Sequence, residues 1–123
     1  MIWLICKSLS ILVYLDFIIY FRGFKVLHRR VREQPLLCPR PAQTSANVCH
    51  AVDLACVIYF KQVLCLQRSA ATTILLRRQG CRAQMVIGVQ LLPPKSHAWV
   101  EVGGMVINDK PYIADVYREL ERC

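Results

Sequence analysis

The chain opens with a nearly unbroken run of apolar residues, which predicts a long helix. Residues 2–22 carry this run, and Gly23 follows as a typical helix end. The next segment, to about residue 42, is basic and rich in proline, so we expect a short helical turn and then an extended linker. Its prolines are Pro35, Pro39 and Pro41.

Two further helices are expected in the middle of the chain. Apolar residues recur every three or four positions between Val48 and Tyr59, and Thr44 or Ser45 can cap the helix that they define, which should end near Phe60. The next helix is expected over residues 65–79. Cations in its last turn would meet the negative end of the helix dipole, and a glycine follows it: Arg77, Arg78 and Gly80.

In the rest of the chain, the spacing of the apolar residues changes from the period of a helix to that of a strand. Gly103-Gly104 between two β-prone segments is a strong hairpin signal, and Pro93-Pro94 separates these segments from an earlier one. Strands are therefore expected over 82–91, 96–102 and 105–108, and a short helix over 114–122. Helices followed by a small antiparallel sheet make an α+β layout.

The length of 123 residues predicts a single domain. Within it, we expect residues 1–42 to form an apolar helix and basic linker, and residues 43–123 to form the core that carries the chemistry. The net charge of +8 favours anionic partners. Much of this charge lies in one stretch, in which Glu33 is the only acid: Arg22, Lys25, Arg29, Arg30, Arg32 and Arg40. A solvated basic face and a docking site for a partner are both open interpretations of this stretch.

Residues 1–24 are near the length of a membrane span, but Lys7, Asp16 and Arg22 interrupt them. A charge at the centre of a span costs about 2.5–3.5 kcal/mol on insertion scales. We therefore expect a helix that packs on the domain or on a partner, with membrane association as the alternative. The features of a signal peptide are not clear in this segment.

Cysteine usage indicates a reducing compartment. The seven cysteines are an odd number without regular spacing, and no two of them form a CxxC pair, so we expect a cytoplasmic protein and no disulfide scaffold. Cys49, His50 and Cys56 share a predicted helix, but a zinc site needs four closely spaced ligands. We predict no metal and no cofactor.

Three residues in order suggest a thiol nucleophile. Cys65 starts a predicted helix, where the positive end of the dipole favours the thiolate. His97 starts a predicted strand, and Asp109 follows the next one. The two lie opposite each other on one face if Gly103-Gly104 belongs to a three-residue bulged loop that begins at residue 102; a two-residue turn would set His97 and Asp109 on opposite faces. Taken singly, each of the three has an ordinary structural explanation: a buried thiol, a hydrogen-bonded histidine and a turn aspartate.

Short strings in a fixed order accompany these residues: Cys-Leu-Gln-Arg-Ser, Leu-Leu-Arg-Arg-Gln-Gly-Cys-Arg-Ala, Val-Ile-Gly-Val, His-Ala-Trp-Val-Glu-Val and Val-Ile-Asn-Asp. Because of these strings, residues 60–109 resemble the lasso-peptide leader peptidase family, which is transglutaminase-like. The resemblance implies a transglutaminase/papain-like core and a cysteine protease that removes the leader from a precursor peptide before macrolactam cyclisation. It implies Cys65 as nucleophile, His97 as base and Asp109 as its orienter.

The resemblance also implies partners. Some members carry a leader-recognition domain, whereas only some 60 residues precede Cys65 here. We therefore expect a stand-alone form that works with a separate leader-recognition protein and with an asparagine-synthetase-like lasso cyclase. Arg68 and Trp99 are candidate substrate contacts, or else a cap on a buried acid and plain core.

Three other functions remain open at this point. Acyl transfer to an amine, as in transglutaminases, would use the same thiol. A non-catalytic, membrane-proximal adaptor would use the apolar start and the basic stretch. Nucleic-acid binding is the weakest of these, because the basic stretch lacks interleaved aromatic residues and a recognition-helix pattern.

Overall fold

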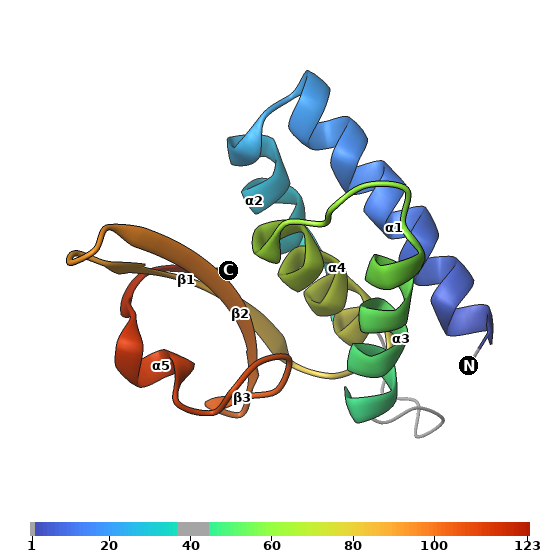
Figure 1. Ribbon diagram of the computed structural model, residues 1–123. Coiled ribbons are helices and arrows are strands. Elements are labelled where there is room, and N and C mark those ends of the chain that lie inside the picture. The colour runs from blue at the N-terminus through green and yellow to red at the C-terminus, as the bar shows by residue number, and fades with distance from the viewer. Residues whose placement is uncertain (1, 37–44) are drawn as a thin grey trace.

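The computed structural model describes residues 2–36 and 45–123, which fold into a helical layer against one face of a sheet (Figure 1). The order of elements confirms the predicted α+β class. The elements are α1 (Ile2–Phe21), α2 (Phe24–Glu33), α3 (Ser45–Ile58), α4 (Cys65–Arg78), β1 (Ala83–Gln90), β2 (Lys95–Val102), β3 (Met105–Val106), α5 (Ile113–Val116) and β4 (Arg118–Arg122).

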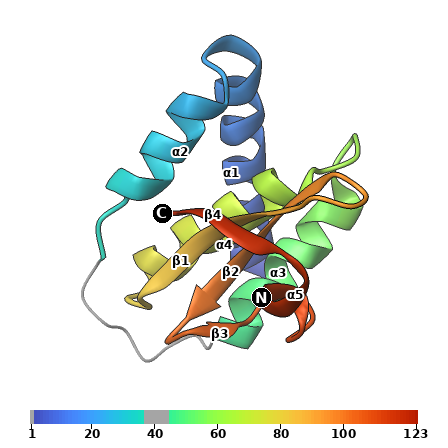
Figure 2. The same cartoon turned by 90° about the vertical axis from the view of Figure 1, so that its left-hand side faces the viewer.

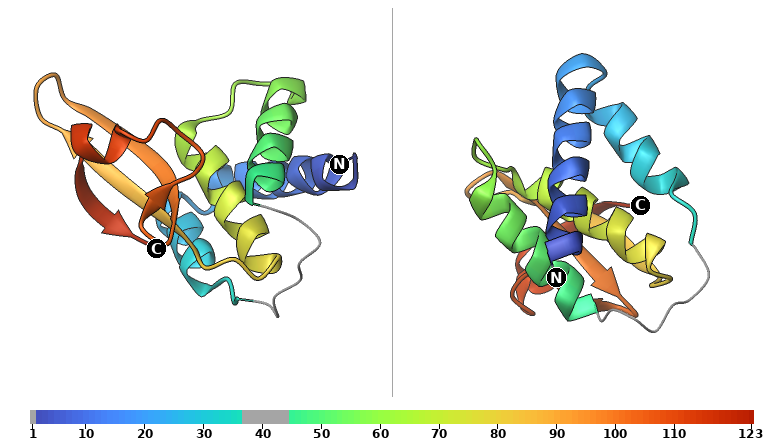
Figure 3. Two further views of the ribbon diagram at one scale, coloured as in Figure 1. Left: turned by 90° about the horizontal axis from the view of Figure 1, so that it is seen from below. Right: turned by 90° about the vertical axis from the view of Figure 1, so that its right-hand side faces the viewer.

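Helix α4 is the centre of the fold. It packs on β1 and β2 on one side and contacts α1, α2 and α3 on the other, so that α1 and α3 lie on the side of α4 away from the sheet (Figure 3). Nine residues of α4 are buried. The apolar core on both sides of it includes Leu12, Leu15, Val52, Leu75 and Val100, all 0% exposed. Burial of each such side chain contributes about 1.5–3 kcal/mol to the free energy of unfolding.

Helix α1 buries one apolar face and leaves another in contact with solvent. The charge of Asp16 within it is matched from the α3 side, because Lys61 Nζ lies 2.8 Å from its carboxylate and the Tyr59 hydroxyl donates to it over 2.6 Å. The helix thus packs on the domain, as one of the two interpretations of the sequence expected. By length and composition alone, Ile2–Arg22 is also apolar enough to cross a membrane, a test that core helices and signal sequences pass too.

The sheet is antiparallel with strand order β3-β2-β1-β4 (Figure 2). In the register of β1 and β2, Gly88 lies opposite His97 and Val86 lies opposite Trp99. A Cβ at Gly88 would lie 2.7 Å from the Trp99 ring and 2.8 Å from the Cβ of Tyr117. Glycine at this position therefore lets two aromatic side chains pack beside the histidine.

The basic segment is more helical than predicted. Where a short turn was expected, α2 runs for ten residues. Leu27 and Val31, one turn apart, are its buried residues, and the half-buried Val26 adds to their apolar contact, so that α2 packs on α1 and α4. Helix α3 begins at Ser45, as predicted, and ends two residues before Phe60. The predicted linker prolines at 39 and 41, the Thr44 cap and Arg40 lie outside the described residues.

The predicted C-terminal helix over 114–122 is wrong. A single short turn, α5, is followed by strand β4, which pairs antiparallel with β1 and places Glu121 opposite Ile87. The charged residues of this segment favour a helix locally, but β1 would otherwise be an open edge of the sheet. Arg122 joins the strand to its neighbours by an ion pair with Glu101 in β2 (3.1 Å) and a hydrogen bond to Gln84 in β1 (2.9 Å).

Candidate active site

Cys65 is the first residue of α4 and is exposed. Its predecessor Leu64 is extended, and no side chain caps the helix. The first helical hydrogen bond runs from Arg68 N to Leu64 O (2.9 Å), so the backbone N–H groups before it, that of Cys65 included, point out of the helix end. This end combines a thiol with free N–H donors, which are the parts needed to bind an oxyanion.

Two buried side chains of α4 hold this helix end in place. Gln67 is 1% exposed and donates from Nε2 to the carbonyl of Leu12 in α1 over 2.9 Å. Ser69 is 0% exposed and donates from Oγ to the carbonyl of Ala98 in β2 over 3.0 Å. The helix that carries Cys65 is therefore tied both to the helical layer and to the strand that carries His97.

His97 and Asp109 form a direct pair. Nε2 of His97 lies 2.6 Å from Oδ2 of Asp109, and Oδ1 of Asp109 accepts a hydrogen bond from the backbone N–H of Lys110 over 2.8 Å. Partial burial alone would raise the pKa of Asp109, but these two hydrogen bonds, together with the electrostatic attraction of His97 and Arg68, lower the pKa below the ordinary value. The ionised carboxylate fixes the histidine ring and leaves Nδ1 for proton exchange.

Aromatic rings cover the histidine. The ring of Tyr117 stacks on His97 with centroids 5.4 Å apart, and that of Trp99 lies 6.3 Å away. Trp99 shares the strand face of His97, as predicted. These rings limit the rotation of the imidazole and keep water from that side of it.

The predicted route to the His97–Asp109 pair is wrong, although the pair itself forms. Val102 pairs with Met105, and Gly103 and Gly104 both have positive φ, so the hairpin has a two-residue turn rather than the bulged loop. The pair forms because the ladder stops early. Strand β3 ends at Val106, and the last backbone bond to β2 is from Ile107 N to Val100 O (3.0 Å). Beyond it the chain leaves the sheet, which frees Asp109 from the face that the register would impose.

At this point the side chain of Asn108 takes the place of a backbone acceptor in the hydrogen-bond ladder. It is 9% exposed, and its Oδ1 accepts the backbone N–H of Val100 over 2.8 Å where a strand carbonyl would otherwise do so. Its Nδ2 lies 3.2 Å from Oγ of Ser69, and its carbonyl accepts from Arg68 Nη2 over 2.7 Å. Sequence reasoning included Asn108 in a strand and missed this function. An Asn-Asp pair at a strand end is the signal that points to it.

Asn108→Ala is expected to destabilise the fold by about 1–3 kcal/mol, because it leaves the buried N–H of Val100 without its acceptor. It should also displace Asp109 from His97 and lower any activity of the site. Urea unfolding gives the change in stability. Activity is measured well below the unfolding midpoint, and the account is wrong here if the variant is as stable as the unchanged protein.

A cavity of about 160 Å³ brings Cys65 and His97 together. It lies between the helical layer and the sheet, and its walls come from α2, α4, β1 and β2. Asp109 does not line the cavity itself, but it is hydrogen-bonded to His97, which does. The lining residues are Phe24, His28, Cys65, Leu66, Ile87, Ser96, His97 and Ala98. A nucleophile, a base and an apolar wall thus converge on one opening of the molecule.

The two candidate substrate contacts do not line this cavity. Trp99 is 1% exposed, and its indole N–H donates to Glu101 Oε2 over 2.8 Å. Arg68 donates to the carbonyl of Asn108 and lies 3.7 Å from Asp53. The contacts of Trp99 fit its interpretation as core. Arg68 does not cap a buried acid, because Asp53 is exposed and the hydrogen bond of Arg68 goes to a backbone carbonyl.

The other thiols have different surroundings. Burial, together with the Asp53 carboxylate, raises the pKa of Cys49 to about 11. Burial also raises the pKa of Cys56 and Cys123. Cys6 is the other exposed thiol among residues 2–36 and 45–123, and Cys38 lies outside them. Within the same ranges, no three His, Cys, Asp or Glu side chains gather as a metal site.

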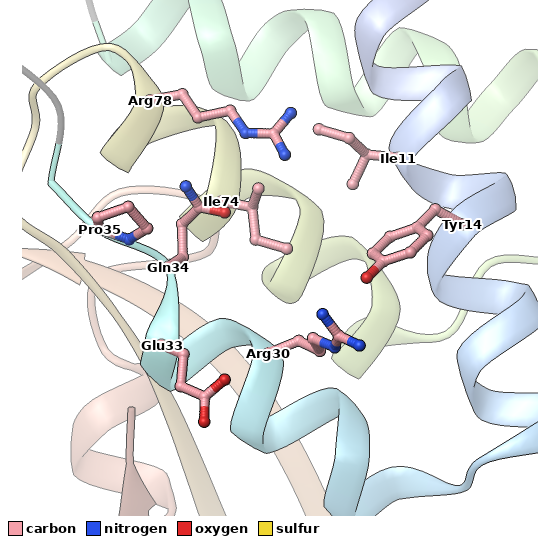
Figure 4. A pocket seen from close by; sticks show the side chains of 8 residues that line it. All are labelled: Ile11, Tyr14, Arg30, Glu33, Gln34, Pro35, Ile74 and Arg78. Atoms are coloured by element: carbon pink, nitrogen blue, oxygen red, sulfur yellow. The ribbon is translucent and has the colours of Figure 1, made fainter.

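A larger cavity, of about 290 Å³, lies between α1, α2 and α4 (Figure 4). Arg30 and Arg78 extend into it from opposite sides, with Tyr14 and Ile74 between them. It offers charge but neither a thiol nor a histidine. It therefore lacks the residue types that the predicted reaction needs.

The chain matches the model of the transglutaminase-like superfamily over residues 11–122, and it therefore belongs to that superfamily. The fold predicted from the resemblance is thereby confirmed. Among curated proteins, it is similar to the Microcin J25-processing protein McjB of Escherichia coli, with 49% identity over 51 residues. The match covers 42% of this chain and 24% of that protein, so the chain spans about a quarter of the length of this relative. No solved structure matches.

Proposed function

We propose that this protein is a cysteine peptidase that removes the leader peptide from a lasso-peptide precursor before the macrolactam ring closes. The observation that carries the proposal is the shared cavity of Cys65 and His97, with Asp109 bonded 2.6 Å behind the histidine. The printed name of the E. coli relative, a microcin J25-processing protein, supports the substrate class.

In the first half of the reaction, His97 accepts the proton of the Cys65 thiol, and the sulfur attacks the carbonyl carbon at the leader–core junction. The backbone N–H of Cys65 stabilises the oxyanion. When the intermediate collapses, the C–N bond breaks and His97 donates its proton to the leaving amine of the core peptide. The leader is then held on Cys65 as a thioester.

In the second half, His97 takes a proton from water, and the hydroxide attacks the thioester carbonyl. The C–S bond breaks, the leader leaves as a carboxylic acid, and the thiol recovers its proton. One water is consumed for each peptide bond cleaved. Asp109 stabilises the imidazolium that forms in each half.

The proposal includes partners. The freed amine of the core peptide is the substrate of a lasso cyclase, and a separate protein supplies leader recognition. The basic outer face of α2 is available to such a protein, since Lys25 and Arg29 are exposed on it. We place the reaction in the cytoplasm, with α1 as a possible contact to the membrane.

Membership of the transglutaminase-like superfamily favours one alternative, transfer of the acyl group to an amine instead of water. The same thiol would attack the side-chain carboxamide of a glutamine, so that ammonia, and not the core amine, would leave as the thioester forms. The masses of the products separate the two, because hydrolysis adds one water to the precursor and crosslinking removes ammonia from two reactants.

Iodoacetamide labelling at pH 7 tests the proposed nucleophile. Cys65 is expected to be alkylated at least about tenfold faster than Cys6, because Cys65 shares its cavity with His97 whereas Cys6 lies outside that cavity. Peptide mapping after short exposures gives both rates from one sample. Equal rates at the two exposed thiols would contradict the proposal and favour a non-catalytic adaptor.

A further inference from the structure

The outer face of α1 is apolar although it is in contact with solvent. Seven large apolar residues of this helix are between 45% and 83% exposed. Four of them are aromatic, share one side of the helix and form what we term the aromatic stripe: Trp3, Tyr14, Phe17 and Phe21. A surface helix of a soluble domain carries charged and polar residues on this side, so an exposed apolar face of this kind marks a surface that another molecule covers.

The cavity of about 290 Å³ between α1, α2 and α4 lies beside the aromatic stripe, and Tyr14 belongs to both. Arg30 and Arg78 enter this arginine cavity from opposite sides (Figure 4). Neither of them forms an ion pair with a carboxylate among residues 2–36 and 45–123. Two like charges that share one cavity repel each other, and an anion bound between them removes the repulsion.

The rest of the lining of the arginine cavity fits a phosphate that is joined to apolar groups. The Tyr14 hydroxyl and the Gln34 amide offer further hydrogen-bond donors, and Ile11 and Ile74 supply apolar walls. Glu33 also lines the cavity but makes no ion pair with either guanidinium in the described part of the chain. Guanidinium groups bind phosphate oxygens in pairs, which makes two of them a strong phosphate site.

Helix α1 can meet a membrane with its outer face while its inner face stays in the core. Six of its residues are buried in the domain, and Asp16 is tied to Lys61 and Tyr59, so a helix that crossed the bilayer would lose all of these contacts. A helix that lies on the surface keeps them. Its aromatic rings enter the headgroup boundary, and Lys7, whose ammonium lies 3.9 Å from the centroid of the Trp3 ring, stays among the headgroups.

We propose that the aromatic stripe docks on a membrane surface and that the arginine cavity binds the phosphate of an anionic phospholipid, whose acyl chains lie along the stripe. Charge complementarity favours this occupant, because the chain carries a net charge of +8 and the cytoplasmic leaflet of a membrane is negative. The inference goes beyond the proposed function and does not depend on it, since no residue of the arginine cavity lines the cavity at Cys65.

Flotation of the full chain with vesicles tests the inference. The unchanged protein is expected to float with vesicles of phosphatidylcholine and phosphatidylglycerol, and to stay unbound with phosphatidylcholine alone. Arg30→Gln/Arg78→Gln should weaken binding about 20-fold, the combined effect of two cations at an anionic surface. Lys95→Gln/Arg118→Gln is the control, because it removes the same charge from exposed positions of the sheet. It should bind within about twofold of the unchanged protein, since salt screens charges far from the surface.

A second pair of variants tests the aromatic stripe. Phe17→Gln/Phe21→Gln is expected to weaken binding at least about tenfold, because two rings lose their contact with the acyl chains. Leu92→Gln/Leu120→Gln, at positions of the sheet that are 90% and 68% exposed, should stay within about twofold. The urea midpoint shows whether each variant folds. Where a double variant does not fold, its single replacements carry the same prediction, with losses of about threefold or more.

Equal binding to the two kinds of vesicle would overturn the assignment of the phosphate, and equal losses in Arg30→Gln/Arg78→Gln and its control would overturn that of the cavity. Glycerol 3-phosphate, at the concentration of the anionic lipid, should release no protein, because it lacks acyl chains; release would show a site for free phosphate instead. A protein that stays unbound with both vesicles would overturn the whole inference and leave a protein partner as the occupant of the stripe. Failure of the proposed function is distinct: in that case Cys65 reacts with iodoacetamide no faster than Cys6.

Discussion

Replacement of Cys65 by alanine is expected to lower leader cleavage by at least about 10³-fold, because no other group in the cavity can form the thioester. The fold should persist. Cys65 is exposed at a helix start, and alanine is a good helix former, so the loss of the sulfur removes little buried contact. Cleavage is followed by mass spectrometry of the precursor, and the urea midpoint reports the fold.

Cys6→Ala is the matched control, since Cys6 is also exposed on a helix but lies outside the cavity. It should cleave at the rate of the unchanged protein. Cleavage that survives in Cys65→Ala would contradict the assignment of the nucleophile, whatever the control shows.

Asp109→Asn is expected to lower kcat by about 10³–10⁴-fold with little change in KM. The reason lies in the two hydrogen bonds of the aspartate. The asparagine keeps Oδ1 on the N–H of Lys110, so its amide N–H₂ faces Nε2 of His97. Nε2 must then be an acceptor, the ring proton moves to Nδ1, and Nδ1 can no longer take a proton from the thiol. Steady-state kinetics separates kcat from KM.

Asp115→Asn provides the control for Asp109→Asn, because it makes the same change of charge at an exposed position close in sequence. It should leave kcat within about twofold of the unchanged value, as is usual for surface substitutions. An Asp109→Asn enzyme with undiminished kcat would show that the contact between His97 and Asp109 is not part of the mechanism.

The helices and the first two strands could be predicted from the sequence because each has a strong local signal. The apolar run over residues 2–22 lies within one helix, and the change of period near Gly80 marks the boundary between α4 and β1. Strand β4 has no such signal: its charged residues are helix formers, and only the open edge of β1 makes them extended. Helix α2 was underestimated because two buried residues, Leu27 and Val31, carry its packing.

The candidate site, too, could be predicted from the sequence only in part. Cys65, His97 and Asp109 could be named from residue type and order, supported by the resemblance. Their geometry could not, because register arithmetic treats a strand as continuous, whereas the side chain of Asn108 replaces the ladder and releases Asp109.

The central proposal is that Cys65 and His97 hydrolyse one peptide bond of a precursor peptide bound in their cavity. The direct test incubates the protein with a lasso-peptide precursor, with and without a separate leader-recognition protein, in ¹⁸O-labelled water. Mass spectrometry is then used to weigh the products. The account predicts a free core peptide and a leader that carries one ¹⁸O in its new carboxylate. An intact precursor, or a crosslinked product that has lost ammonia, would contradict it.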